Sequence, residues 1–184
     1  MFRAIKQSAF LLLLVFTLAG CATRTTGQRM AELNAPVNKL SYSVMPWKAV
    51  NPGFAHGLVE DAMDDLLPLL STRVPLVFGL NGIEAGQYDK SRYHLVLNPR
   101  TAIYDTNGGG FWYVEIFIAA SIIDREQNSR KVWAGEVKIL NSTKTAICDK
   151  SVDEFPKLLL AQLSDDKVVK LESGEIKVPS EGKQ

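Results

Sequence analysis

The feature that most limits the possible folds is a fourteen-residue stretch, residues 111–124, in which two kinds of position alternate. The even positions from 112 to 122 are all apolar and the odd positions are mixed, which is the two-residue period of a β-strand with one buried face. We therefore predict a long strand from Phe111 to Asp124. The even positions, predicted to face the core, are Trp112, Val114, Ile116, Ile118, Ala120 and Ile122; the odd positions are Phe111, Tyr113, Glu115, Phe117, Ala119 and Ser121.

Three other segments favour strands that pair with this one. They are residues 40–45, ended by Pro46; residues 93–97, interrupted at Pro99 and continued past a bulge through 101–104; and residues 131–139. A turn signal at 107–110 and a polar loop at 125–130 separate neighbouring strands. The strands at 93–104, 111–124 and 131–139 therefore read as consecutive, hairpin-connected neighbours.

Two segments have the three-to-four-residue apolar period of an amphipathic helix. The first starts at Asn51-Pro52 and carries its apolar stripe to Leu70, with acidic residues at 60, 61, 64 and 65 on the other face. We expect Pro68 to kink or shorten its last turn, and residues 76–78 to form a short strand or an extended link. The second helix starts at a capping box, Ser151 to Glu154, and runs to Leu163.

This succession of elements predicts an α+β fold in the order β-α-(β)-β-β-β-α. Runs of strands between two helices favour a mostly antiparallel sheet of about four strands, with both helices packed on one face. The chain has 184 residues and is 46% apolar, which fits one globular domain and excludes a disordered chain.

The strand segments also carry a family resemblance. Tyr93-His94-Leu95, then Asp124, then Trp133-Ala134-Gly135 resemble the strand and hairpin pattern of small periplasmic lipoprotein domains with an anticodon-binding-like α+β fold. The TolB N-terminal domain and accessory lipoproteins of export machines are examples. Arg92 stands where that pattern often has Asp. The resemblance covers about half of the mature chain and implies a fold more than a function.

The first twenty residues read as a targeting segment. Arg3 and Lys6 are the only charges before an apolar run at 9–20. A basic start, about a dozen apolar residues and then small residues are typical of a secretory signal peptide, and the run is too short for a transmembrane helix.

Cys21 follows Leu18-Ala19-Gly20, which resembles the bacterial lipobox. In lipoproteins the cysteine is diacylated on sulfur, becomes the first residue after cleavage, and is then acylated on its amine. The resemblance therefore implies that Cys21 is a lipid anchor, and three acyl chains exceed the two signals that stable membrane attachment needs. Ala22 and Thr23 follow Cys21 where a retained inner-membrane lipoprotein has Asp, which implies the periplasmic face of the outer membrane.

The predicted organisation has four parts. Residues 1–20 are the signal peptide, 21–39 the lipidated Cys and a flexible tether with a mean reach of roughly 23 Å, 40–168 the periplasmic domain, and 169–184 a polar C-terminal tail. Lipidation of Cys21 leaves Cys148 as a lone thiol, read either as buried and structural or as reactive and available for an intermolecular disulfide.

Composition and motifs exclude several classes of function. A net charge of +1, or about −1 after removal of the leader, gives no electrostatic reason to expect nucleic acid. His56 and His94 stand alone, so we expect no metal site, and we expect no other cofactor. No nucleophile motif is present, and the glycines at 108–110 precede a strand instead of a phosphate-binding helix. We therefore expect a protein that is not an enzyme.

The aromatic residues are the candidate interaction surface. Phe111, Tyr113 and Phe117 lie on the odd face of the long strand, which is core if helices cover it and an aromatic patch if it is open. Trp47 and Trp112 are placed at one end of the sheet, and Trp133 in the core. The leading interpretation is an outer-membrane lipoprotein that acts as a non-enzymatic accessory or scaffold subunit of an envelope assembly. Its partners would be other envelope proteins or further copies of itself. The alternative is a module that binds glycan, peptidoglycan or lipid on its aromatic surface.

Overall fold

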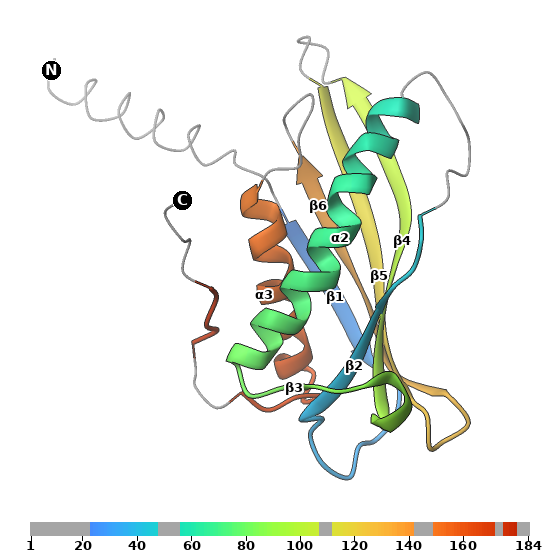
Figure 1. The fold of residues 1–184 in the computed structure, drawn as a ribbon, viewed down its shortest axis with the longest axis vertical. Helices are drawn as coiled ribbons and strands as arrows, with labels where there is room; N and C mark the ends of the chain where they lie inside the picture. Colours follow the sequence, from blue (N-terminus) through green and yellow to red (C-terminus); the bar gives the residue numbers. More distant parts are fainter. Residues whose placement is uncertain (1–22, 48–55, 107–111, 142–148, 172–174, 180–184) are drawn as a thin grey trace, which may run out of the picture.

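The structure, a computed structural model, describes residues 23–47, 56–106, 112–141, 149–171 and 175–179. Six strands form one sheet and two α-helices pack on it (Figure 1). The strands are β1 (Thr23–Arg29), β2 (Lys39–Val44), β3 (Glu84–Ala85), β4 (Tyr93–Thr106), β5 (Trp112–Asp124) and β6 (Arg130–Asn141). The helices are α2 (His56–Leu80), the short 3₁₀ helix η1 (Tyr88–Lys90) and α3 (Asp149–Asp165).

The sheet is mixed and larger than predicted. Its strand order is β1-β6-β5-β4-β2-β3; β2 runs parallel to β3 and β4, and the other pairs are antiparallel. The α+β class is confirmed, but the prediction of about four strands is wrong. β1 and β3 are the additional strands, and both lie at sheet edges, where the pairing comes from distant segments and leaves little trace in a local pattern.

The three central strands follow the sequence prediction closely. β4 continues past Pro99, and its register with β5 shifts between Pro99 and Thr101, which confirms the predicted bulge. Of the even positions of β5 whose side chains are described, Ile116, Ile118 and Ile122 are fully buried. The turn predicted at 107–110 lies outside the described residues.

β1 corrects the prediction of a flexible tether at 21–39. All seven of its residues pair antiparallel with β6, from Thr23 opposite Ile139 to Arg29 opposite Trp133. The domain therefore begins by Thr23 and not near Leu40. The physical reason lies at Gly27, where an added Cβ atom would lie 2.5 Å from the indole of Trp133. The indole of Trp133 therefore packs directly on the backbone of β1 at Gly27.

α2 is longer than predicted and includes residues 76–78, so the strand or extended link expected there is wrong. Pro68 does not end the helix, which continues for twelve residues beyond it and also contains Pro75. Pro68 is exposed and Pro75 is half-buried, whereas the fully buried side chains lie at Leu66, Leu70 and Val74. The pyrrolidine rings therefore lie off the buried face, where the missing hydrogen bonds leave the packing intact.

The end of α2 is fixed by local hydrogen bonds. The N–H of Ile83 donates to the carbonyl of Phe78 (3.0 Å) and that of Gly82 to the carbonyl of Gly79 (3.2 Å), which together form a Schellman motif. Gly82 has a φ of 85°, the left-handed conformation that this motif requires. The irregular stretch predicted after residue 79 is therefore the stop of the helix.

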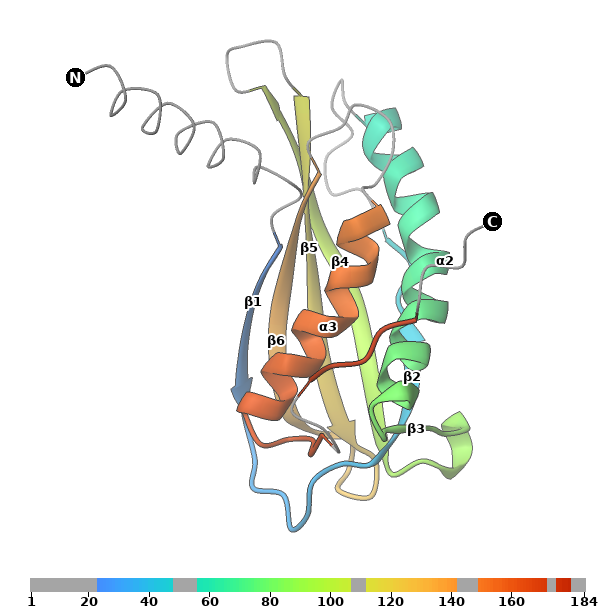
Figure 2. The ribbon, with the colours of Figure 1, turned by 90° about the vertical axis from the view of Figure 1, so that its left-hand side faces the viewer.

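The core lies between one face of the sheet and both helices. Figure 2 shows α2 and α3 on the same side of the sheet, as predicted. Trp133, predicted as core, is fully buried there. Other core side chains include Leu40, Leu95, Leu97, Val137 and Ile139 from the sheet; Met63, Leu66, Leu70, Val77 and Phe78 from α2; and Phe155, Leu159, Leu160 and Leu163 from α3.

The predicted C-terminal tail is partly docked on the domain. Val169, its first residue, is buried, and Ile176 packs against the core. The side chain of buried Asn81 donates to the carbonyl of Lys177 (2.8 Å) and accepts from its N–H (2.9 Å). The polar composition of this segment did not indicate the docking. The hydrogen bonds to Lys177 use its backbone N–H and carbonyl, which do not depend on the side chain.

Candidate interaction surface on the open sheet face

Neither α2 nor α3 packs on the opposite face of the sheet; we call it the open face (Figure 2). On β5 it carries the odd positions, which are half-buried from Glu115 to Ile123, in contrast to the buried even positions. The prediction had left open whether this face was core or surface. The half-buried side chains of the described residues show that it is surface.

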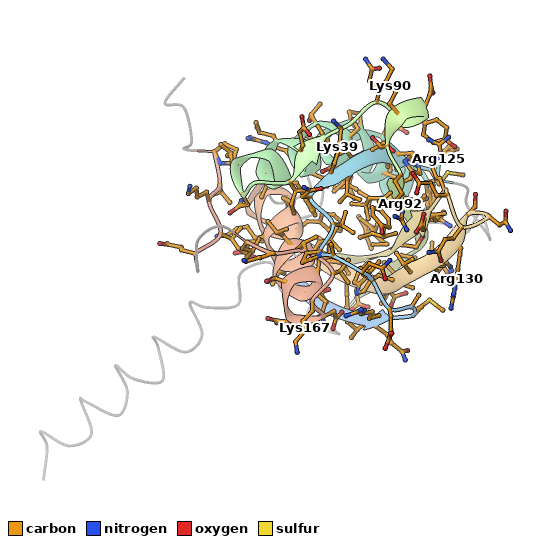
Figure 3. All side chains as sticks on the ribbon, turned by 90° about the horizontal axis from the view of Figure 1, so that it is seen from below. Lys39, Lys90, Arg92, Arg125, Arg130 and Lys167 are labelled. Carbon is orange, nitrogen blue, oxygen red and sulfur yellow. The ribbon has the colours of Figure 1, made fainter. Side chains whose placement is uncertain are left out.

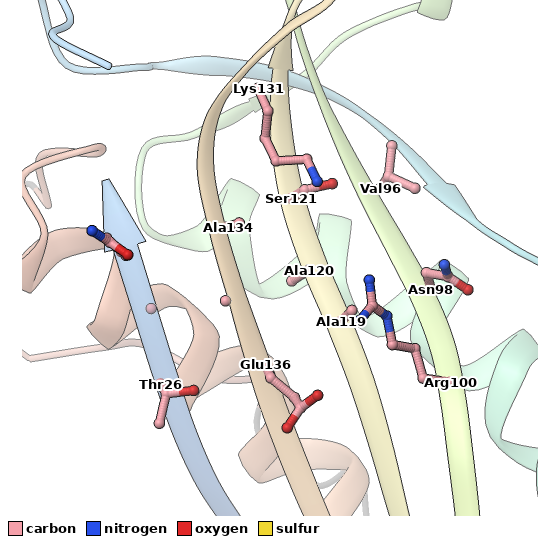
Figure 4. A pocket seen from close by; sticks show the side chains of 13 residues that line it. Thr26, Val96, Asn98, Arg100, Ala119, Ala120, Ser121, Lys131, Ala134 and Glu136 are labelled. Atoms are coloured by element: carbon pink, nitrogen blue, oxygen red, sulfur yellow. The ribbon is translucent and has the colours of Figure 1, made fainter. Parts of the chain in front are cut away.

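The centre of the open face is hollowed by about 540 Å³, a volume within the range of ordinary ligand sites. Four strands contribute, β1, β6, β5 and β4 (Figure 4). Small side chains form the floor, among them Thr26, Ala119, Ser121 and Ala134; longer polar ones form the rim, namely Gln28, Asn98, Arg100, Lys131 and Glu136. We call this feature the open-face hollow. Its depth follows from side-chain size, because a short floor between long rim residues leaves space above the strands.

The rim is rich in hydrogen-bond donors. Arg100 and Lys131 carry full positive charges, and among the described residues neither forms an ion pair within 4.0 Å. Glu136 is the one acidic residue that lines the hollow. Figure 4 shows Arg100 directed toward Ala119, and Lys131 toward Ser121. The arrangement suits a partner that fills the floor with short apolar groups and offers acceptors to the rim.

The aromatic residues predicted as an interaction surface are not gathered there. Phe117 lies on the open face, half-buried, with the Lys138 ammonium 5.7 Å from the centre of its ring. Trp47 packs against the core, on the helix side of the sheet. Trp112 and Tyr113 belong to β5, but their side chains lie outside the described residues, as do Phe111 and the predicted anchor Cys21. Cys148 lies outside them too.

A histidine network on the open face escaped the sequence analysis. Nδ1 of His94 lies 2.8 Å from the Ser41 hydroxyl, and Nε2 lies 2.9 Å from the Ser43 hydroxyl. The ring of Tyr88 meets the imidazole edge-on, with 4.8 Å between ring centres, and Arg125 lies 4.1 Å from the centre of the Tyr88 ring. Both ring nitrogens are therefore occupied by hydroxyls.

The parallel pairing of β2 with β4 creates this network. Ser41 is opposite His94 in the register, and Ser43 lies two residues on along the same face of β2. The alternation of residues 40–45 indicated that the two serines share a face. It did not indicate which strand lies beside them, because that pairing joins segments about fifty residues apart.

Acidification is expected to destabilise the protein through His94. Burial lowers the pKa of this imidazole below its ordinary value of 6.5, and the charge of Arg125 lowers it further. The unfolded chain therefore binds a proton more readily than the native state. The stability that the neutral ring contributes is complete above the unfolded pKa and is lost as pH falls through the folded one.

The measurement is the urea midpoint of wild type and of His94→Gln at about pH 7.5 and about pH 5, on either side of the histidine range. Protonation of carboxylates lowers the urea midpoint of both proteins by the same amount. We expect the wild-type midpoint to fall more than that of His94→Gln. Equal falls in the two proteins would show that the ring is not the titrating group.

An ion pair between a buried carboxylate and a partly exposed arginine closes the end of the β5–β6 hairpin. Asp124 is 1% exposed; Arg92 donates to both of its carboxylate oxygens, with the shortest contact at 2.7 Å, and the N–H of Glu126 donates to it at 3.0 Å. The Arg92 hydrogen bonds hold the pKa of Asp124 below its usual range. Figure 3 looks onto this end of the molecule, where Arg92, Arg125 and Arg130 gather. Arg92 departs from the lipoprotein pattern described above, whereas Asp124 matches it. In this chain the first residue neutralises the carboxylate of the second.

The described residues form neither a candidate metal site nor a candidate membrane-spanning helix. No three His, Cys, Asp or Glu side chains in this part of the chain converge on a possible metal position. No helix among the same residues combines the length and the apolar character needed to cross a membrane.

Comparisons with known proteins found solved structures that are similar to this chain. No protein-family model matches the chain, and no curated protein matches it. It is similar to a PelC dodecamer from Paraburkholderia phytofirmans, with 14% identity, a TM-score of 0.45, and coverage of 82% of this chain and 99% of that chain. A variant PelC dodecamer from the same organism has 17% identity and a TM-score of 0.40, with coverage of 82% and 99%. A minor lipoprotein from Acinetobacter baumannii has 15% identity and a TM-score of 0.33, with coverage of 72% and 97%. With TM-scores below 0.5, these similarities assign no family to the chain.

Proposed function

We propose that this chain is a lipid-anchored protein of the bacterial envelope that acts as a non-enzymatic accessory subunit and binds a protein partner on its open sheet face. The observation that carries the binding role is the open-face hollow. Both helices pack on the other side of the sheet, and four strands line the hollow without a covering element in the described chain.

The chemistry of the hollow supports a binding role over a catalytic one. Its lining includes no His, Cys or Asp, and its single carboxylate, Glu136, is half-buried. His94, on the same face of the sheet, has both nitrogens bonded to serines. A floor of Ala and Thr with a rim of Arg, Lys and amide groups offers contact area and hydrogen bonds, which are the ingredients of a polar interface.

The lipobox at 18–21 supports the anchor. Through its resemblance to lipoproteins with no Asp after the cysteine, it also supports the periplasmic face of the outer membrane. Because β1 begins at Thr23, two residues after Cys21, at most about 7 Å of chain separates the anchor from the sheet. The proposed protein is therefore held directly at the membrane surface, which raises its effective concentration for partners in that layer.

Ala119→Glu is expected to weaken partner binding at least about ten-fold without unfolding the domain. Ala119 is half-buried in the floor of the hollow, so the longer Glu side chain would occupy the space that the partner fills and would neutralise Arg100, which is directed toward this position (Figure 4). Overfilling a packed contact costs about 1–3 kcal/mol, which corresponds to roughly ten-fold or more in affinity. Full-length, C-terminally tagged protein is cross-linked in intact cells, purified in mild detergent, and the captured envelope proteins are quantified by mass spectrometry.

Ala85→Glu is the matched control, because it makes the same change at an exposed position of β3 outside the hollow. It should leave capture unchanged. Equal capture by wild type and both variants would contradict a binding role for the open face. Recovery of the wild-type protein with no other envelope protein would contradict the accessory function itself.

A further inference from the structure

Two cations on the rim of the open-face hollow have no counter-charge in the described part of the chain. Arg100 and Lys131 are exposed, and no described carboxylate lies within 4.0 Å of either. Lys138, on the same face of the sheet, is paired with Glu115 at 2.6 Å. A single exposed cation is ordinary, so the direction of these two side chains decides what they can bind.

The two cations come from different strands and reach over the same stretch of a third. Arg100 belongs to β4 and is directed toward Ala119, and Lys131 belongs to β6 and is directed toward Ser121 (Figure 4). Ala119 and Ser121 are successive positions on the open face of β5, about 7 Å apart along the strand. One acidic group above this stretch, or two neighbouring ones, can therefore contact both charges.

The other groups around this point set the polarity of what can bind. Asn98 lies opposite Ala119 on β4 and adds an amide N–H, and the hydroxyl of Ser121 adds a further donor. Glu136 lies opposite Ala119 on the other side, on β6. Its carboxylate repels an anion on the side of β6 and β1 and leaves the side of β4 to it. The hollow is thus a polar site with more positive than negative charge.

We infer that the open-face hollow binds an acidic segment of another envelope protein, with Asp or Glu carboxylates over β5 between Arg100 and Lys131. A carboxylate accepts paired hydrogen bonds from a guanidinium and a further one from an ammonium, so it complements both cations. The small apolar floor positions, Ala119 and Ala134, suit a protein segment, which brings short apolar groups beside its carboxylates, better than an anionic polysaccharide. This inference rests on the proposed role of the open face, and names the chemistry of the partner.

Carbodiimide cross-linking tests this contact, because it joins an amine to a carboxylate only where the two groups meet. The reagent activates the partner's carboxylate, and the Lys131 amine displaces the activating group to form an amide. Isolated cell envelopes that contain the full-length, C-terminally tagged protein are treated, denatured and purified through the tag, and the cross-linked peptides are sequenced by mass spectrometry. We expect Lys131 to be joined to an Asp or Glu of another envelope protein.

Two conservative variants show whether the linked amine belongs to the site. Lys131→Arg keeps the positive charge but has no amine that the reagent couples, so it should lose the cross-link and keep its affinity for the partner. Arg100→Lys introduces an amine at the second cation and should add a cross-link to the same acidic segment. Loss of the Lys131 cross-link alone, with none gained in Arg100→Lys, would contradict a carboxylate held between the two residues.

The affinity for the protein identified in this way is the second measurement, made by titration of the two purified proteins in mild detergent. Arg100→Gln and Lys131→Gln should each weaken binding about ten-fold, the usual loss for a hydrogen bond to a charged group. Arg130→Gln is the matched control, because it removes the same charge from the exposed neighbour of Lys131, outside the hollow. It should leave the affinity unchanged.

Several results would overturn the inference. They are a cross-link from Lys131 to a polysaccharide or to a second copy of this chain, no cross-link from Lys131, and equal losses of affinity in Arg130→Gln and Lys131→Gln. Failure of the proposed function is a different result. An envelope protein that is captured without contact to Lys131 would leave the accessory role standing, whereas the absence of any captured protein would contradict both.

Discussion

Replacing Trp133 by alanine is expected to lower the free energy of unfolding by about 4 kcal/mol, the usual loss for a fully buried tryptophan. The indole is 0% exposed, and its Nε1 donates to Asp166 just after α3 at 2.7 Å. It therefore ties β6, β1 and the end of α3 together. Urea denaturation of wild type and variant measures the loss. A change below about 1 kcal/mol, the range of surface substitutions, would contradict this central position.

A double-mutant cycle with Gly27 tests whether β1 belongs to the sheet. In wild type, a Cβ at residue 27 would lie 2.5 Å from the Trp133 indole, so Gly27→Ala should cost about 1–3 kcal/mol by overpacking. In the Trp133→Ala background the nearest clashing atom is gone, and the other two, Asp166 Oδ2 and Gln162 Cγ at 2.8 Å, belong to flexible side chains that can move into the vacated space, so most of that cost should disappear. Gly79→Ala is the matched control; nothing lies within 4 Å of its added methyl, so it should stabilise α2 by about 0.8 kcal/mol in both backgrounds. A flexible tether would give no cost at Gly27 in either background.

The error about β1 has an identifiable physical origin. Residues 23–29 read Thr-Arg-Thr-Thr-Gly-Gln-Arg, which has no apolar alternation to indicate a strand. The segment is held by backbone hydrogen bonds to β6 and by the indole against Gly27, both of which involve residues more than a hundred positions away. Patterns predict strands that bury side chains, and they miss an edge strand that contributes mainly its backbone.

The extent of α2 was underestimated for a different reason. The run Leu76-Val77-Phe78 has strand-like residues between a proline and a glycine, and a short apolar run of this kind is ambiguous between strand and helix. Tertiary packing decides the outcome, because Val77 and Phe78 are fully buried on the side of α2 that continues from Val74. The positions of Pro68 and Pro75 also allow the helix to continue, because neither ring lies on its buried side.

The candidate surface was predicted in part. Strand alternation correctly separated a buried face of β5 from a second face, and Phe117 lies on that second face. The predicted surface consists of aromatic residues, whereas the hollow comes from small ones, Ala119 and Ala134, which are neighbours only through the pairing of β5 with β6. A void formed by short side chains on adjacent strands has no signal in either strand alone.

Replacing Cys21 by alanine is expected to abolish lipidation completely, which is the largest effect predicted for this chain. The lipobox resemblance implies that acylation of the Cys21 sulfur precedes cleavage of the leader, and alanine has no sulfur to acylate. We expect incorporation of a clickable palmitate analogue to fall to background, and the chain to keep residues 1–20, as intact-mass measurement will show. Cys148→Ala, which removes the other cysteine, should keep full label and a cleaved leader.

The short connection to β1 adds a structural consequence to this result. With at most about 7 Å of chain between Cys21 and Thr23, a lipidated protein holds the start of β1 within a few ångströms of the acyl chains. A spin label at residue 23, the start of β1, should therefore be broadened by a paramagnetic lipid headgroup, and one at residue 29, the other end of β1, about 20 Å further along the strand, much less. A flexible tether would give both labels the same weak broadening. Retention of the palmitate label in Cys21→Ala, or its loss in Cys148→Ala, would contradict Cys21 as the anchor.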